Sequence, residues 1–192
     1  MKHLLHCLIA LALSSCLPIQ DFGSYWDKGY IDESVIGNWD ISDSAAKIKK
    51  EAKTEIVHVT SKGNTFSVEF IENGKTQAEQ DQLIGRTLNA GVYKYFLYGS
   101  RSEIKNAKGM LFRYVVKDNY FMIYDLKPDS LFKLLHDKYS SVTNIKKADC
   151  TSRIICEPIE ITKLDEGVFK ILSQIPDTLE FWTMSAASVR TK

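Results

Sequence analysis

The sequence predicts a mainly β fold of the α+β class, an antiparallel meander that curls into an open sheet or into a barrel of roughly eight or nine strands. Three observations predict it. Short apolar runs are bounded by turn residues along most of the chain. The connections between these runs are too short for a parallel crossover. Apolar residues at helical spacing come only near the C-terminal end, where two amphipathic helices are expected to cover one face or opening of the sheet.

Alternation of apolar and polar residues and the turn residues place the strands. Phe66, Val68 and Phe70 alternate with polar neighbours, which is the period of a strand with one buried and one solvated face. Asn73-Gly74 offers two residues that tolerate positive φ, and Asp118-Asn119 separates two further strands. The predicted strands cover residues 35–41, 55–60, 66–70, 80–88, 92–98, 110–117, 120–126, 159–161 and 179–184.

The two helices are predicted from spacing and from their end signals. Pro128 suits a first helical turn, and a helix over residues 128–142 gathers its leucines on one face. The second helix is expected to start at a variant capping box from Thr162 to Asp165 and to stop at Pro176.

The N-terminus has the pattern of an export leader. Lys2 gives a short positive region, and residues 4–13 form an apolar run too short for a permanent transmembrane helix. The segment Leu13-Ser14-Ser15-Cys16 follows, and it resembles the lipobox of bacterial lipoproteins. The resemblance implies that residues 1–15 are removed and that Cys16 is lipidated and holds the chain in the membrane. An ordinary secretory leader with a chance cysteine is the alternative.

The same resemblance places the protein in the bacterial cell envelope. In the enteric version of the family an aspartate after the cysteine signals retention at the inner membrane; this chain has Leu17, so the outer membrane is expected. The chain carries 25 Lys and Arg against 24 Asp and Glu, and Lys2 leaves with the leader, so the mature charges balance. A neutral chain is not expected to bind nucleic acid.

Two cysteines remain beyond the lipidation site. An even pair in an exported chain is a disulfide candidate, and Cys150 and Cys156 can close a small loop. Metal binding by the same pair is the alternative, although no second cysteine pair accompanies it.

The mature chain has the length of one domain. Residues 16–34 are expected to form the lipidated N-terminus and a tether, because Pro18, Gly23 and Gly29 interrupt any regular pattern. Aromatic residues in this tether could pack on the domain or lie at the lipid interface. Residues 35–192 form the predicted single β-rich domain.

Gly37 and Trp39, on the first predicted strand, are similar to the G-x-W motif of lipocalins. In that family the glycine permits close backbone approach, the tryptophan closes the barrel floor, and a C-terminal arginine packs on the tryptophan. The resemblance implies structural roles for Gly37 and Trp39, makes Arg190 the candidate arginine, and implies a cavity for a small apolar ligand.

The sequence contains no legible catalytic constellation. Ser-x-x-Lys begins at Ser44, Ser102 and Ser130, without the S-D-N and K-T-G companions of penicillin-recognising enzymes. His58 and His136 are isolated, and each is expected to be structural. We therefore predict neither an enzyme nor a cofactor or metal site.

Aromatic residues crowd the segments 93–98 and 112–124. They imply either a core on one face and a binding surface on the other, or a barrel with a filled interior. The functional hypothesis is an anchored envelope lipoprotein whose non-catalytic domain binds a protein partner or a small apolar ligand. The alternatives are a structural accessory of an envelope assembly and a hydrolase with scattered residues.

Overall fold

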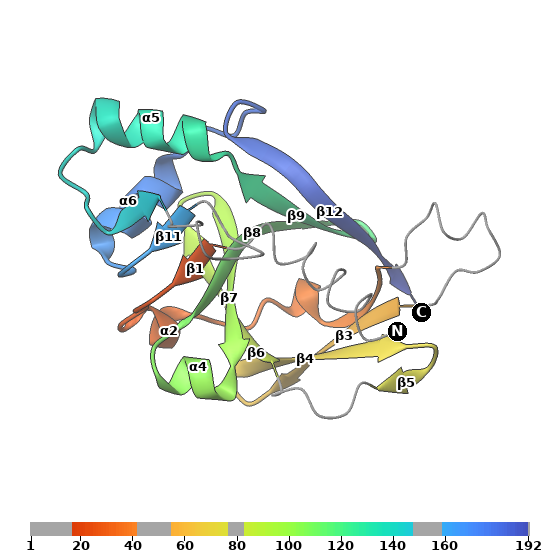
Figure 1. Ribbon diagram of the computed structural model, residues 1–192. Helices are drawn as coiled ribbons and strands as arrows, with labels where there is room; N and C mark the ends of the chain where they lie inside the picture. The colour runs from red at the N-terminus through yellow and green to blue at the C-terminus, as the bar shows by residue number, and fades with distance from the viewer. Residues whose placement is uncertain (1–16, 42–54, 77–82, 148–158, 192) are drawn as a thin grey trace.

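The computed structural model describes residues 17–41, 55–76, 83–147 and 159–191. These residues form a closed eight-stranded antiparallel β-barrel, four further strands and four helices (Figure 1). The predicted fold class is confirmed, and of the two arrangements left open, open sheet or barrel, the chain adopts the barrel.

The barrel is a meander in which each strand pairs with the next and the last pairs with the first. Two turns with positive φ lie where the sequence predicts them: Asn73 and Gly74 form the turn into a two-residue strand outside the ring, and Asp118 lies in a turn between two barrel strands. A two-residue strand, β5 (Lys75–Thr76), pairs with β4 outside the ring. Around the barrel the strands are β2 (Gly37–Asp40), β3 (Glu55–Lys62), β4 (Thr65–Glu72), β6 (Leu83–Ala90), β7 (Tyr93–Ser100), β8 (Gly109–Lys117), β9 (Tyr120–Leu126) and β12 (Trp182–Thr191).

Three short strands extend the wall beside β8. β9 pairs with only the C-terminal half of β8, from Arg113 to Lys117. The N-terminal part of β8, around Leu111, pairs instead with β1 (Leu17–Ile19). The added strands are β1 (Leu17–Ile19), β11 (Ile159–Ile161) and β10 (Ile145–Lys147). β10 ends this side of the sheet and carries exposed lysines, which disfavour pairing with another chain.

Two amphipathic helices cover the outer face of this extended wall. They are α5 (Pro128–Lys138) and α6 (Glu166–Gln174), whose buried residues belong to the same apolar cluster as those of β1 and β11; α6 lies beside β11 in Figure 1. Leu131 and Leu135, on the apolar face predicted for the first helix, are buried. The shorter helical elements are α2 (Tyr25–Lys28), α4 (Arg101–Lys105) and the 3-10 helix η1 (Glu33–Val35).

The wall formed by β6, β7 and β8 separates two apolar clusters. On β7, Tyr95 and Leu97 point outward and Phe96 points inward, and all three are buried. We call the outward group, which includes the buried residues of β1, β11, α5 and α6, the outer core. We call the inward group the inner cluster; its buried members are Val35, Trp39, Val59, Phe66, Phe96 and Tyr114.

The segment 17–34 is part of the domain, which corrects the predicted tether. Leu17 and Ile19 lie in β1 with 6% and 2% of their surface exposed, and Phe22 and Tyr25 are buried in the outer core. Three residues of strand are too few to give a recognisable alternation, so the turn residues dominated the sequence pattern.

Three predicted boundaries also need correction. α5 ends at Lys138 rather than at residue 142, because the chain leaves helical geometry at Tyr139 (φ −134°). α6 is capped by Asp165, whose carboxylate accepts from the backbone N–H of Val168, rather than by Thr162. The last strand starts at Trp182 and continues to Thr191, well beyond the predicted 179–184.

Candidate functional site

The inward-pointing residues of the barrel form the candidate functional site. Directly paired residues of neighbouring strands share one face of a sheet, so the register identifies the inward set. It begins at Trp39, whose partner on β3 is Val57. The further apolar members include Val59, Phe66, Val68, Phe96, Phe112, Tyr114, Val116 and Phe121.

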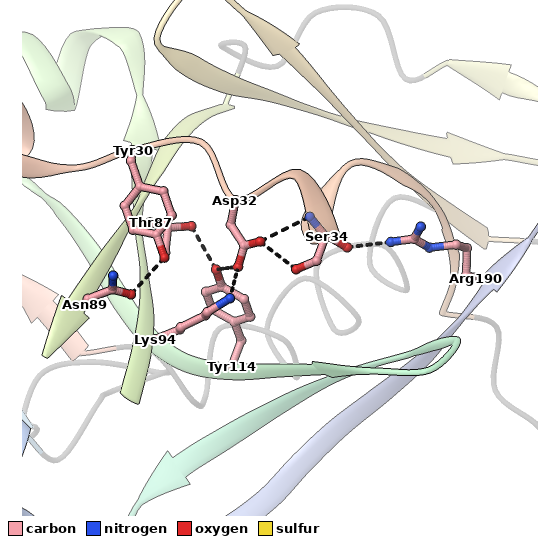
Figure 2. A network of polar contacts seen from close by, with 8 residues as sticks. All are labelled: Tyr30, Asp32, Ser34, Thr87, Asn89, Lys94, Tyr114 and Arg190. Atoms are coloured by element: carbon pink, nitrogen blue, oxygen red, sulfur yellow. Dashed lines mark hydrogen bonds and ion pairs between the residues drawn. The ribbon is translucent and has the colours of Figure 1, made fainter. Parts of the chain in front are cut away.

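A segment before β2 closes one end of the barrel. We call residues 30–36 the strap. Tyr30 forms a two-bond antiparallel bridge with Thr87 on the free edge of β6, with N–O distances of 3.0 and 2.9 Å. The strap then runs past Asp32 and Ser34 to β2 (Figure 2). Val35, in η1, is 1% exposed and packs in the inner cluster, so the strap covers the base of the barrel interior.

Trp39 and Arg190 join the strap to the two strands that close the barrel. The Trp39 indole N–H donates to the Val35 carbonyl at 2.8 Å. Arg190, the partner of Trp39 on β12, places its guanidinium 4.5 Å from the Trp39 ring centroid and donates to the Ser34 carbonyl. Arg190 thus packs on Trp39.

Gly37 is required by its backbone angle. Its φ of 142° is one that residues with a Cβ rarely adopt. Space is not the limiting factor, because an added Cβ would meet only Arg190, at an ordinary 3.7 Å. The structural roles predicted for Gly37 and Trp39 therefore have a physical basis in the strap and its closure.

Asp32, a buried residue of the strap, is the centre of a polar network (Figure 2). Its carboxylate accepts from Lys94 Nζ at 2.6 Å and from the Tyr114 hydroxyl at 2.9 Å. The backbone N–H and the hydroxyl of Ser34 donate to its other oxygen, at 3.1 and 2.6 Å. Because Tyr114 donates to Asp32, Thr87 donates in turn to Tyr114 at 2.8 Å. The network ties the strap to three barrel strands.

The surroundings of Asp32 favour its ionised form. Burial is the largest single influence and raises its pKa, but the hydrogen bonds from Lys94, Ser34 and Tyr114 together outweigh burial and leave the pKa below its ordinary value. The hydrogen bond to Asp32 raises the pKa of Lys94, which keeps the ion pair charged at neutral pH. Burial raises the pKa of Tyr114, so its hydroxyl stays protonated and able to donate.

This network is suited to holding structure rather than to proton transfer. Asp32 already accepts four hydrogen bonds, and a carboxylate with a lowered pKa is a weak base at neutral pH. Glu33, its neighbour in sequence, is exposed. A molecule inside the barrel would therefore meet mainly apolar side chains, and the Asp32 network would close the end of the interior.

Exposure varies within the inner cluster. Phe66 and Tyr114 are fully buried, at 0% and 1% exposed. Val57, Val116 and Phe121 also point inward but are only half-buried. On the outward face of β7 and β8, Tyr95, Leu97 and Leu111 are each at most 1% exposed, and Val115, further along β8, is half-buried.

The residues singled out from sequence fall in different places. Cys16, Cys150, Cys156 and Ser44 lie outside the described residues, so the lipidation and disulfide predictions stay predictions. Other residues lie away from the barrel interior: His58 hydrogen-bonds to Asn38 on the outer face, His136 is exposed beside Asp137, Ser102 lies on α4, and the Ser130 hydroxyl donates to the Glu180 carbonyl.

Across 17–41, 55–76, 83–147 and 159–191, no group of three or more His, Cys, Asp or Glu side chains is placed to hold a metal ion. No helix in these ranges has both the length and the apolar character needed to cross a membrane.

Sequence reasoning missed two charged residues, the exposed Lys94 and the buried Arg113. Lys94 and Arg113 each interrupt an otherwise apolar and aromatic strand, and that interruption was the available signal. Lys94 belongs to the strap network. Arg113, 5% exposed, points outward, pairs with Asp177 at 2.8 Å, and has its guanidinium 4.3–5.0 Å from three ring centroids, those of Tyr93, Tyr124 and Trp182.

The chain was compared with protein-family models, with curated proteins and with solved structures, and none of them matches it.

Proposed function

We propose that this chain is a lipid-anchored lipoprotein of the bacterial cell envelope whose barrel binds a small apolar ligand. One observation carries the ligand: apolar side chains that point into a closed barrel, such as Val116 and Phe121, keep accessible surface although they lie inside the fold. Accessible apolar surface inside a barrel favours a small apolar molecule over water and is out of reach of a folded partner.

Likeness to lipocalins supports the same proposal. The family shares the eight-stranded up-and-down barrel. Here the barrel has that order, the G-x-W pair of Gly37 and Trp39 lies on its first strand, and Arg190 from its last strand covers Trp39. We propose that the resemblance extends to the use of the interior as a binding site.

The leader supports the anchor. The lipobox-like segment ends at Cys16, and Leu17 is already a buried residue of β1. An anchor at Cys16 would therefore hold the domain close to the membrane, with no spacer between lipid and fold. The residue after the cysteine favours the outer membrane.

The ligand is tested by filling the barrel. Val115 and Val116 are consecutive, both half-buried, and point to opposite faces of β8. Native mass spectrometry of the full chain, released from detergent with added 1-N-phenylnaphthylamine as an uncharged apolar probe, counts bound probe. We expect Val116→Trp to lower occupancy at least about tenfold and Val115→Trp to leave it unchanged. Equal occupancy in both variants, or no binding to the parent chain, would refute an interior site.

The anchor is tested separately. We expect intact-mass measurement of the mature protein to show a chain that starts at Cys16 with added acyl mass, and Cys16→Ser to move the protein from the membrane fraction to the soluble fraction. An unmodified thiol, or membrane association that survives the substitution, contradicts the anchor and leaves the ligand proposal standing.

A further inference from the structure

Aromatic rings line one side of the barrel interior. Phe96 on β7 and Phe112 on β8 are directly paired, and their ring centroids lie 5.4 Å apart with an interplanar angle of 30°. Phe121 from β9 stacks on Tyr114 at a centroid distance of 5.3 Å and an angle of 11°. Tyr98 meets Phe112 edge to face at 5.5 Å. We call Phe96, Tyr98, Phe112, Tyr114 and Phe121 the aromatic wall.

Gly85 on β6 makes room for this wall. It pairs with Tyr98, so it faces the interior. A Cβ at this position would lie 2.6 Å from Cε1 and 2.7 Å from Cζ of Phe96, separations that real Cβ atoms essentially never show. The Phe96 ring therefore occupies the space that a side chain on β6 would need, and this side of the interior is lined by rings.

Branched aliphatic side chains line the opposite side. In the ring of eight strands each strand faces the one four places away, so β3 lies across the barrel from β8. The inward residues of β3 include Val57 and Val59, and Val68 on β4 is the direct partner of Val59. We call these three valines the valine wall. The interior thus has rings on one side and methyl groups on the other.

Both walls become more accessible with distance from the strap. On β8, Tyr114 contacts the strap and is 1% exposed, whereas Phe112, two residues along the strand, is only partly buried. On β3, Val59 is 5% exposed and Val57 is only partly buried. A molecule in this part of the interior would therefore contact a ring on one side and methyl groups on the other.

We propose that the ligand of this barrel is a planar, uncharged aromatic molecule rather than a flexible alkyl chain. This inference rests on the proposed function, because it names the class of ligand that the interior takes. A planar ring system gains stacked or edge-to-face contact with the aromatic wall beyond the burial of its area. An alkyl chain gains no ring contact and loses rotational freedom when it binds. The ligand is uncharged because Lys94 and Asp32 already pair with each other.

The ligand class is tested by competition between two uncharged molecules of similar octanol–water partition, the planar phenanthrene and the straight-chain decan-1-ol. Native mass spectrometry of the full chain counts bound 1-N-phenylnaphthylamine while either competitor is added at one fixed detergent concentration. Because the competitors partition similarly into the micelles, the detergent changes the ratio of their effects little. We expect phenanthrene to halve the occupancy at a concentration at least about tenfold lower than decan-1-ol does.

The aromatic wall is tested with a matched pair of variants. Phe112→Leu removes a partly exposed ring and keeps an apolar side chain, so we expect the preference for phenanthrene to shrink about fivefold. Phe132→Leu makes the same change to a partly buried residue of α5 that packs on the outer core, and the preference should stay unchanged. The ratio of the two competitors does not depend on the affinity of the reporter. Thermal unfolding midpoints and displacement by decan-1-ol establish that each variant is folded.

The outcomes separate this inference from the proposed function. Equal displacement by the two competitors, or stronger displacement by decan-1-ol, would overturn the aromatic class and leave the interior site standing. A preference that Phe112→Leu leaves as large as Phe132→Leu does would overturn the role of the aromatic wall. A parent chain that binds no 1-N-phenylnaphthylamine would refute the interior site itself, and this inference with it.

Discussion

The two faces of β7 build different environments from similar residues. Outward, Tyr95 and Leu97 meet the helices in the outer core, where both are at most 1% exposed and the Tyr95 hydroxyl donates to the Leu172 carbonyl of α6. Inward, Phe96 meets Phe66 and Phe112 in a run of aromatic contacts. Beyond this run the inward side chains, such as Val116, become half-buried, and so does the outward Val115 on the same strand.

The comparison suggests that the two faces of the wall contribute differently to stability and to binding. A covered apolar residue contributes its full transfer free energy to folding, whereas a partly exposed one contributes less, in proportion to its buried area, and keeps some surface for another molecule. We infer that the outer core supplies most of the stability of the fold and that the barrel interior is available for binding. The strap network holds the base of the interior, because Asp32 connects it to the wall.

The largest effect is expected in the outer core. Leu97→Ala removes a side chain with 0% exposure and leaves a cavity between β7 and the helices, so we expect a loss of about 3–4 kcal/mol in the free energy of unfolding. Denaturant titration of the full chain measures it. Val92→Ala, at an exposed position, should stay within about 0.5 kcal/mol. A loss of unfolding free energy below about 1 kcal/mol for Leu97→Ala would contradict the inference that the outer core supplies most of the stability.

The next effect concerns the strap and depends on pH. Asp32→Asn removes the charge that Lys94 and Tyr114 contact, and we expect a loss of about 2 kcal/mol at neutral pH. The folded-state pKa of Asp32 lies below its ordinary value of 3.8, so its contribution is complete above that value and is lost as the pH falls through the folded-state pKa. Parent and variant should therefore converge in stability as the pH is lowered below about 4.

Glu33→Gln is the matched control for this pH dependence. Glu33 is the adjacent carboxylate on the strap, but it is exposed, so its neutralisation should change the stability by less than about 0.5 kcal/mol at any pH. If Asp32→Asn were as mild as Glu33→Gln, the strap would not depend on the network.

The meander could be predicted from sequence because its signals are local. Alternation with a period of two residues predicts β4. Turn residues predict two hairpins, one at Asn73 and Gly74 and the other at Asp118. The closure of β12 on β2 and the joining of β1 to β8 depend on pairings between segments far apart in the chain, which no local pattern encodes. For this reason the sequence predicts a tether where the folded chain has strand β1.

The candidate site, too, has residues that a local pattern predicts and residues that only folding brings together. Gly37 and Trp39 were recognisable because a short motif carries them. Asp32, Lys94 and Tyr114 are dispersed over the strap and two strands, and only folding brings their side chains together. A lysine in an aromatic strand marks an anomaly in the sequence, but its partner 62 positions away does not follow from it.

The smallest effect provides the sharpest test of the two faces. Val116→Ala removes two methyl groups from a half-buried inward position, and we expect a loss of about 1 kcal/mol or less. Val168→Ala removes the same groups from α6, where Val168 is 0% exposed, and should cost about twice as much, because a cavity is added to the lost burial. Denaturant titrations of both variants give the two losses. Equal losses would mean that the barrel interior is as tightly packed as the outer core, and the argument for a binding space would then fail.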